Sequence, residues 1–177
     1  MGVLKVQYLP QYQIEDYISW EGDWELIHGI PYAMSPSPGV GHQRSGRKAL
    51  NVLEEALKLA SCKCEVFYEL DWQVKKDTVV RPDLIVLCGA ELKKDFVNQT
   101  PALVIEILSP TTEEKDRTLK AELYAEVGVV NYIIIDPLKN EIEVFLLTQG
   151  KYQLNKSPII HLEECEIVPD WSHVFEE

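Results

Sequence analysis

Two carboxylates interrupt apolar stretches of the sequence, and they are the residues most suited to chemistry. Glu106 lies inside residues 102–108, which are otherwise apolar, and Asp83 comes directly before the apolar residues 84–87. An unpaired carboxylate in such a place costs several kcal/mol, so each acid needs a cation, a metal ion or a position at a sheet edge. A structural ion pair would satisfy either acid alone. Two carboxylates that converge from neighbouring strands instead favour Mg²⁺ or Mn²⁺, which prefer oxygen ligands.

A lysine on the next predicted helix is the third candidate. The helix is expected to begin at a threonine cap, Thr111 or Thr112, and to stop at Gly128. Its apolar side chains fall on one stripe when residues are placed about 100° apart, and they are Leu119, Leu123, Tyr124 and Val127. Lys120 lies in the middle of that stripe, so its ammonium either bends out to solvent or points at the carboxylates on the sheet. Arg117 flanks the same face and is expected to reach a phosphate. The remaining charges of the helix are expected in solvent, namely Glu114, Lys115, Glu122 and Glu126.

The elements that must position these residues follow from hydrophobic periodicity and turn residues. In chain order we expect a short helix at 14–18, a β-hairpin of strands 24–28 and 30–34, a loop at 35–41, a helix at 43–60, strands at 65–74, 79–87 and 102–108, the helix described above, a strand at 131–136, and a closing hairpin of strands 141–147 and 151–154. Pro82 breaks the strand at 79–87 early because proline cannot donate to a sheet. We therefore expect one α/β domain over residues 1–177, with a mixed central sheet, flanking helices and an N-terminal hairpin.

Charge argues against a broad nucleic-acid-binding surface. The chain has 177 residues, and 17 Lys and Arg oppose 29 Asp and Glu, so the net charge is −12. Phosphate backbones and anionic membranes attract proteins through clustered Lys and Arg. A bound divalent cation would reverse the sign of the charge locally, assisted by Arg81, Arg117 and Lys120. We therefore expect weak, metal-dependent engagement of nucleic acid and no membrane partner.

Compartment is inferred from targeting signals and cysteines. Residues 1–10 have no long apolar core, and no run of about 18 apolar residues occurs, so neither a signal peptide nor a transmembrane helix is expected. The cysteines lack the spacing of a zinc knuckle, and they are Cys62, Cys64, Cys88 and Cys165. We therefore expect free thiols in a cytoplasmic protein.

Several motifs resemble those of a known family. They are Trp24 to Gly29, Met34 to Pro36 with His42 and Gln43, Arg81 to Asp83, Val104 to Thr112, then Asp116, Lys120, Tyr124, Gly128, Val129 and Tyr132 to Pro137. In this order they resemble the PD-(D/E)xK nuclease superfamily and, more specifically, the Uma-two family of restriction-endonuclease-like bacterial proteins. Leu108 stands where the superfamily's strand carries a lysine, and Lys120 matches the lysine that this family carries on the following helix.

The resemblance implies a restriction endonuclease-like fold and a metal-dependent endonuclease that hydrolyses DNA phosphodiester bonds. Asp83, Glu106 and the backbone carbonyl of Ile107 would hold Mg²⁺, with Mn²⁺ as a substitute. Lys120 would orient or deprotonate the attacking water, or stabilise charge on the phosphate. Nucleases of this fold often act as dimers, so a homodimer is also expected.

Further residues have two interpretations each. Glu25 matches an early acid that lies near the metal in related nucleases, and otherwise it is an exposed strand residue. Glu69 either touches the metal or lies on a solvated face. His42 either contacts a phosphate or the active site, or is an ordinary histidine at a helix start. Tyr124 is expected to pack under Lys120.

Two other functions remain open at this point. A non-catalytic nuclease-fold scaffold that binds protein or nucleic acid would agree with the acidic charge. Glycoside hydrolysis by a carboxylate pair needs no metal ion. Serine hydrolysis and dinucleotide or P-loop binding are disfavoured, because the sequence lacks their glycine-containing motifs.

Overall fold

A mixed β-sheet forms the centre of the molecule. The computed structural model describes residues 9–34, 39–89 and 97–176, and within them the larger sheet has the order β10-β9-β8-β7-β6-β3. Its strands are β3 (Cys64–Tyr68), β6 (Leu84–Cys88), β7 (Leu103–Ile107), β8 (Asn131–Asp136), β9 (Glu141–Thr148) and β10 (Lys151–Leu154). Strands β7 and β8 run parallel, whereas the other neighbouring pairs are antiparallel. Parallel neighbours need a crossover connection, and here it contains the helix that follows Glu106.

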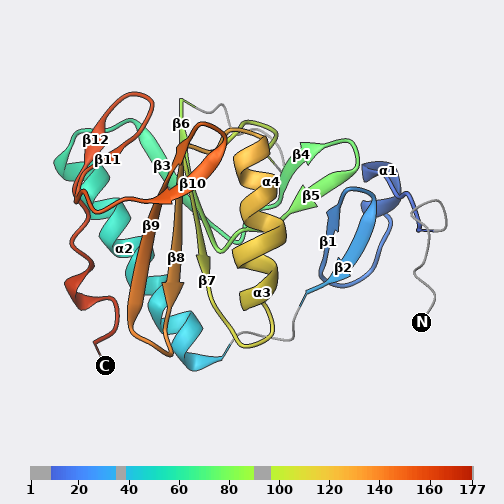
Figure 1. Cartoon of the computed structure of the whole chain (residues 1–177), viewed down its shortest axis with the longest axis horizontal. Helices are drawn as coiled ribbons and strands as arrows, with labels where there is room; N and C mark the ends of the chain where they lie inside the picture. Colours follow the sequence, from blue (N-terminus) through green and yellow to red (C-terminus); the bar gives the residue numbers. More distant parts are fainter. Residues whose placement is uncertain (1–8, 35–38, 90–96, 177) are drawn as a thin grey trace.

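Helices cover both faces of this sheet (Figure 1). Helix α2 (Val40–Leu59) packs on one face against Leu103, Ile105 and Ile107 of β7. The crossover, made of α3 (Glu113–Lys115), the π-helix η2 (Asp116–Lys120) and α4 (Ala121–Glu126), covers the other face, to which Val104 contributes. Because successive strand residues point to opposite faces, Glu106 is directed toward the crossover helix.

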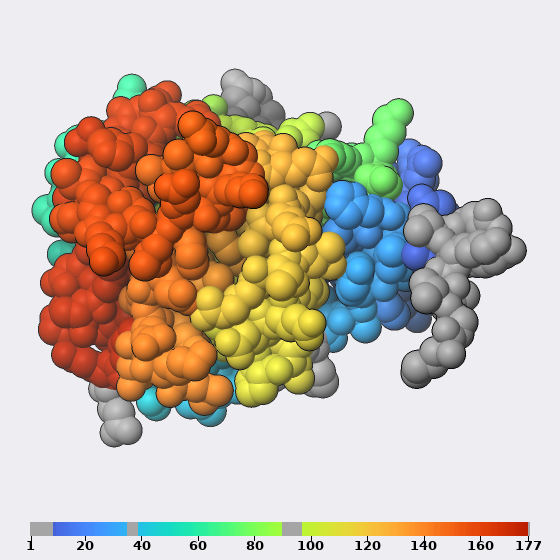
Figure 2. Space-filling model, viewed as in Figure 1, coloured from blue at the N-terminus to red at the C-terminus, as the bar shows by residue number. Residues whose placement is uncertain are grey.

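A smaller sheet lies beside the larger one and has the order β2-β1-β5-β4 in the described part of the chain. Its strands are β1 (Trp24–Ile27), β2 (Ile30–Ala33), β4 (Trp72–Lys75) and β5 (Thr78–Val80), and α1 (Ile14–Tyr17) precedes them. Strands β1 and β2 form the expected N-terminal hairpin, with positive φ at His28 and Gly29, as a tight hairpin turn requires. The hairpin abuts the crossover helix in the space-filling view (Figure 2).

The predictions of single strands at 65–74 and 79–87 are wrong, because each segment crosses from one sheet to the other. The first leaves the larger sheet after Tyr68, and the second enters it after Asp83. Glu69 has φ 49° and its N–H donates to the Asp83 carbonyl at 3.0 Å, so the chain bends at both residues together. Pro82 stands at the bend, where no ladder donor is needed. Asp83 and Glu69 are thereby placed where the two sheets meet.

Other predicted elements are confirmed. The long helix, the strand at 131–136 and the closing hairpin occur as α2, β8 and β9–β10. The α/β fold class with a mixed sheet is confirmed as well. The predicted loop at 35–41 and the N-terminal segment 1–10 lie partly outside the described residues. Within the described residues, no helix is both long enough and apolar enough to cross a membrane.

The C-terminal segment was not predicted to form structure. It contains β11 (Ile160–His161), β12 (Glu166–Ile167) and the 3₁₀ helix η3 (Trp171–His173). Its apolar side chains join the core under α2, and they are Ile160, Leu162, Ile167 and Val174. The expectation of free thiols is also wrong for this structure, because Cys62 is paired with Cys165 and Cys64 with Cys88 as disulfides. The partners are 103 and 24 residues apart in the sequence, so only the fold brings them together.

Candidate active site

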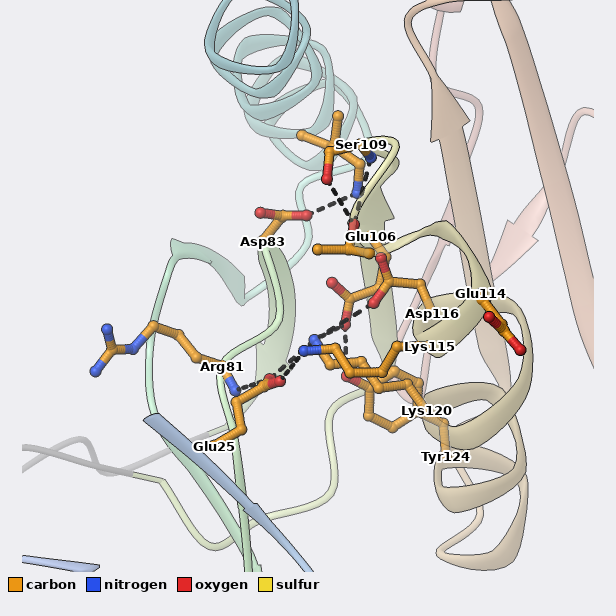
Figure 3. Close-up of polar contacts among 12 residues, drawn as sticks. Glu25, Arg81, Asp83, Glu106, Ser109, Glu114, Lys115, Asp116, Lys120 and Tyr124 are labelled. Atoms are coloured by element: carbon orange, nitrogen blue, oxygen red, sulfur yellow. Dashed lines mark hydrogen bonds and ion pairs between the residues drawn. The ribbon is translucent and has the colours of Figure 1, made fainter. Parts of the chain in front are cut away.

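A pocket of about 350 Å³ lies where the two sheets meet the crossover helix. Its lining includes five acids, Glu25, Glu69, Asp83, Glu106 and Asp116, together with His42, Arg81, Lys115 and Lys120. These residues come from both sheets, from α2 and from the crossover, and several of them point toward one another in Figure 3. The three residues expected to be catalytic therefore line one pocket.

Lys120 lies at the centre of the charged cluster. Its Nζ is 2.9 Å from Glu106 Oε1, 2.9 Å from Glu25 Oε1 and 3.7 Å from Asp116 Oδ1. Only 3% of Lys120 is exposed, so the prediction that it faces inward rather than out to solvent is confirmed. Burial lowers the pKa of Lys120, but the three carboxylates outweigh it and hold the pKa well above its ordinary value. The ammonium is therefore protonated at neutral pH.

Glu106 is buried between the sheet and the crossover helix. Besides the ion pair with Lys120, Oε1 accepts a hydrogen bond of 2.6 Å from the Tyr124 hydroxyl. Tyr124 therefore contacts Glu106 directly, in addition to stacking on Trp72. Burial raises the pKa of Glu106 well above its ordinary value, and Lys120 offsets only part of this. Since a nearby cation lowers a carboxyl pKa, a metal ion would favour the ionised form.

Glu25 is buried, with 1% of its surface exposed, so it is not an exposed strand residue. Its Oε1 accepts a hydrogen bond of 2.9 Å from the Arg81 backbone N–H, and its Oε2 lies 2.6 Å from Lys115 Nζ. Burial alone would raise the pKa of Glu25, but Lys120 and Lys115 lower it below its ordinary value. Glu25 is thus an ionised partner for two lysines.

Lys115 was expected in solvent, and that prediction is wrong. Glu114 does point away from the cluster, whereas Lys115 reaches Glu25 (Figure 3). The physical reason is the π-helical turn from Asp116 to Lys120, which closes i→i+5 hydrogen bonds and is wider than an α-helical turn. The assumed 100° per residue fails across such a turn, so Lys115, Asp116 and Lys120 all face the pocket. Asp116 and Lys115 are charged pocket residues to which the sequence analysis gave no role in the site.

Asp83 lies on the other side of the pocket from the lysines. Its Oδ2 accepts a hydrogen bond of 2.7 Å from the Ile107 N–H, and its Oδ1 is 3.3 Å from His42 Nε2. Burial lowers the pKa of His42, but the contact with Asp83 outweighs it and raises the pKa. Within the described residues, His42 Nδ1 is buried without a hydrogen-bond partner. His42 and Glu69 both line the pocket, so the structure places both of these accessory candidates beside Asp83.

Two arginines expected to offset the acidic charge bind other acids. Arg117 lies 2.6 Å from Glu143 and 3.3 Å from Glu113, and it is not among the residues that line the described pocket. The Arg81 side chain points away from the cluster in Figure 3. It pairs with Asp71 at 2.6 Å and with Asp23 at 2.8 Å. The structure therefore does not place Arg117 where the sequence analysis expected it.

The donor set of the pocket suits a hard divalent cation. Carboxylates and a backbone carbonyl are oxygen ligands that suit Mg²⁺ or Mn²⁺, and the orphaned His42 Nδ1 is a further polar atom in the same region. Among the described residues, however, no three carboxylate or imidazole ligand atoms of the pocket lie within 4.8 Å of one another. The described pocket side chains therefore do not by themselves form a closed three-ligand cation site.

Comparisons with known proteins agree with this fold. Residues 14–176 match the model of the Uma2 family, described as "Putative restriction endonuclease". An uncharacterised protein of Synechocystis sp. is 29% identical over 151 residues, which cover 77% of this chain and 74% of the relative. A crystal structure of "a putative nuclease belonging to DUF820" from Anabaena variabilis has a TM-score of 0.70 and 19% identity, and covers 86% of this chain and 90% of that one.

Proposed function

Because the chain belongs to the Uma2 family, we propose that it is a metal-dependent endonuclease that hydrolyses the phosphodiester bonds of DNA. The observation that supports this most directly is the convergence of Asp83, Glu106 and Lys120 on one pocket. Asp83 comes directly before β6 and Glu106 lies in the neighbouring strand β7, whereas Lys120 comes from the crossover helix. This arrangement supplies carboxylates for a cation together with a separate ammonium group.

The proposed metal ligands are Asp83, Glu106 and the backbone carbonyl of Ile107, with His42 beside them. When bound, Mg²⁺ or Mn²⁺ would neutralise charge on the phosphoryl group and lower the pKa of a water molecule. Lys120 pairs with Glu106 at 2.9 Å, and Asp83 accepts a hydrogen bond from the Ile107 N–H. These contacts position the two carboxylates that would hold the cation.

Lys120 acts as a hydrogen-bond donor in this proposal rather than as a base. Its three acidic neighbours hold its pKa well above the ordinary value, so it has no free lone pair at neutral pH. It can orient the attacking water or donate to the phosphoryl oxygen on which charge develops. Glu25 positions Lys120 through the contact at 2.9 Å, and Lys115 in turn neutralises the other oxygen of Glu25.

Nicking of supercoiled plasmid DNA in Mg²⁺ or Mn²⁺ tests the proposal. We expect Asp83→Asn, Glu106→Gln and Lys120→Met each to lower the rate by about 100-fold or more, as loss of a transition-state contact or an acid–base group does. Arg117→Ala is the matched control: its guanidinium binds Glu113 and Glu143 outside the pocket, so it should cleave like the wild type.

Isothermal titration with Mn²⁺ gives a second readout that does not depend on cleavage. The wild type should bind Mn²⁺, and Glu106→Gln, which keeps the shape of the side chain, should not. Cleavage by Glu106→Gln and Asp83→Asn at the wild-type rate would refute the proposed site. The homodimer that we expect would appear as a doubled mass in sedimentation equilibrium.

A non-catalytic scaffold is the second candidate, and the arginine pairing favours it. Arg81 and Arg117 are both neutralised by neighbouring acids, and the net charge is −12, so few free cations are available for DNA. This candidate predicts binding without cleavage. A wild-type protein that binds Mn²⁺ and yet leaves both DNA and RNA intact would support it over the nuclease.

A further inference from the structure

A cluster of sulfur atoms lies at the far end of the strand pair that carries Asp83. Cys64 begins β3 and Cys88 ends β6, and the two residues are directly opposite each other with their Cα atoms 4.0 Å apart. Cys62 comes just before β3, and Cys165 comes just before β12 in the C-terminal segment. The chain has four cysteines, and all of them join or contact the core on the α2 face of the sheet.

The spacing between the two cysteine pairs is the informative feature. Sulfur atoms of Cys62, Cys64 and Cys165 lie within 4.8 Å of one another, although Cys64 is bonded to Cys88 and not to the other two. Two disulfides require closeness within each pair but none between pairs. A tetrahedral thiolate zinc site requires closeness among all of its sulfurs, because Zn–S bonds of about 2.3 Å set the sulfur atoms about 3.8 Å apart. Cys62, Cys64 and Cys165 form such a group of three, and Cys88, which is outside the group but bonded to Cys64, would supply the fourth thiolate by a side-chain rotation.

We propose that in the reduced protein Cys62, Cys64, Cys88 and Cys165 together bind one structural Zn²⁺ ion. Each thiol loses its proton to solvent as its sulfur becomes a thiolate ligand, and no oxidation or reduction takes place. The disulfide-paired arrangement is the oxidised, metal-free state of the same four residues. Four sulfur ligands close the coordination shell, as in structural rather than catalytic zinc sites.

The backbone around the cluster already holds the ligands in place. The N–H of Cys62 donates to the Leu57 carbonyl at 3.0 Å, and the carbonyl of Cys165 accepts from Leu162 at 2.8 Å. Cys64 and Cys88 are buried, whereas Cys62 and Cys165 are partly exposed and leave an entry path for the ion. Zinc would thereby fasten the C-terminal segment to the end of α2 and to the edge strand β3.

This site is separate from the acidic pocket. Cys88 is five residues from Asp83 along the chain, which is about 16 Å in a strand. Thiolates select zinc, whereas carboxylates select Mg²⁺ or Mn²⁺. Its existence therefore does not depend on the proposed nuclease activity.

The test is the metal content and spectrum of protein purified under reducing, oxygen-free conditions. Elemental mass spectrometry should find one zinc per chain, and Co²⁺ exchanged into the protein should give a thiolate-to-cobalt charge-transfer absorption band. Glu106→Gln should retain both signals, because it changes the acidic pocket only. Cys62→Ser and Cys165→Ser, at the partly exposed positions, should lose the bound zinc at chelator concentrations that the wild type withstands.

Alkylation of cysteines at the moment of cell lysis, followed by mass spectrometry, distinguishes free thiols from disulfides in the cells. Free, alkylated cysteines together with stoichiometric zinc support the proposal. Disulfides already present in the cells, or reduced wild-type protein that gives no thiolate-to-cobalt band, would overturn it. The cobalt measurement uses the wild-type chain, so it stands even if a cysteine variant fails to fold.

Discussion

Replacement of Lys120 by methionine is the perturbation that tests the electrostatic account of the pocket most directly. Methionine has a similar length and no charge, so Lys120→Met removes the ammonium and leaves the packing nearly intact. Lys120 contacts Glu25, Glu106 and Asp116, all of which are buried. The variant therefore leaves buried carboxylates without their shared cation.

The expected cost is large because one partner of a buried charge pair is removed. Such a change destabilises proteins by about 3–5 kcal/mol. Two features place this case at about 3 kcal/mol: Glu25 keeps Lys115 and the Arg81 N–H, and the raised pKa of Glu106 lets that group take up a proton. For a protein of this length the loss corresponds to a fall of about 6–12 °C in Tm.

The cost should depend on pH, and the sign follows from proton binding. Without Lys120 the folded-state pKa of Glu106, which burial already raises, rises further, so the native variant holds more protons than the unfolded state. Its stability then falls as pH increases above the unfolded carboxyl pKa of about 4.3. Lys120 in the wild type has a raised pKa, so its contribution is fully present below the unfolded lysine pKa of about 10.4 and constant in this window.

Urea unfolding of wild type and Lys120→Met, followed by circular dichroism at pH 5 and at pH 8, measures this prediction. The difference in unfolding free energy should be larger at pH 8 than at pH 5. Lys75→Met is the control, because Lys75 and its partner Glu126 are both exposed and the loss of this ion pair should cause no measurable change. A variant as stable as the wild type, or a deficit equal at both pH values, would refute the reasoning.

Three further predictions concern groups around the site and the sheet. Tyr124→Phe removes the 2.6 Å hydrogen bond to Glu106 and should cost about 1–3 kcal/mol in urea unfolding. Asn131→Leu removes two hydrogen bonds of 2.9 Å from the buried side chain to backbone carbonyls, one of them in β11, and should cost about 2–3 kcal/mol and speed amide exchange of β11. Burial raises the pKa of Asp136, but the hydrogen bonds that its carboxylate accepts from residues 138 and 139 outweigh burial and lower the pKa below its ordinary value. The stabilisation from Asp136 is therefore present above the unfolded pKa of about 3.9 and is lost as pH falls through the lower folded pKa. In acid-dependent unfolding, Asp136→Asn should lose less stability than the wild type between about pH 4 and pH 2.

Each of these has a result that contradicts it. Tyr124→Phe with wild-type stability would mean that the hydroxyl makes no net contribution beside Lys120. Unchanged amide exchange in β11 would show that Asn131 does not secure the C-terminal segment. An acid-unfolding curve for Asp136→Asn that parallels the wild type would exclude Asp136 as a titrating contributor.

The C-terminal half of the site could be predicted because its signals are local. The apolar run around Glu106 identifies a buried strand, and periodicity places Lys120 on the inward face of the next helix. Both inferences hold because burial patterns repeat with the period of the element itself. The assumption of 100° per residue gave the wrong orientation for Lys115, because the π-helical turn changes the angle between the side chains before it and those after it.

Other features depended on contacts between distant segments. The sequence leaves Glu25 either near the metal or exposed, and only the packing of the hairpin against the crossover helix decides that it is buried beside Lys115 and Lys120. Helix periodicity places Arg117 beside the inward face of the crossover helix, but its guanidinium pairs with Glu143 of β9 at 2.6 Å instead of facing the pocket.

By itself, then, the sequence determined the α/β class, the buried strand of Glu106 and the inward face of Lys120, because each is a property of a single element. Tertiary structure alone decided which charges share the pocket and that the sulfurs of Cys62, Cys64 and Cys165 meet beside the Cys64–Cys88 disulfide. Residues 62, 64, 88 and 165 carry no zinc spacing in the chain. The pairing of β3 with β6 and the returning C-terminal segment bring them together, and both depend on contacts between segments that are distant in the sequence.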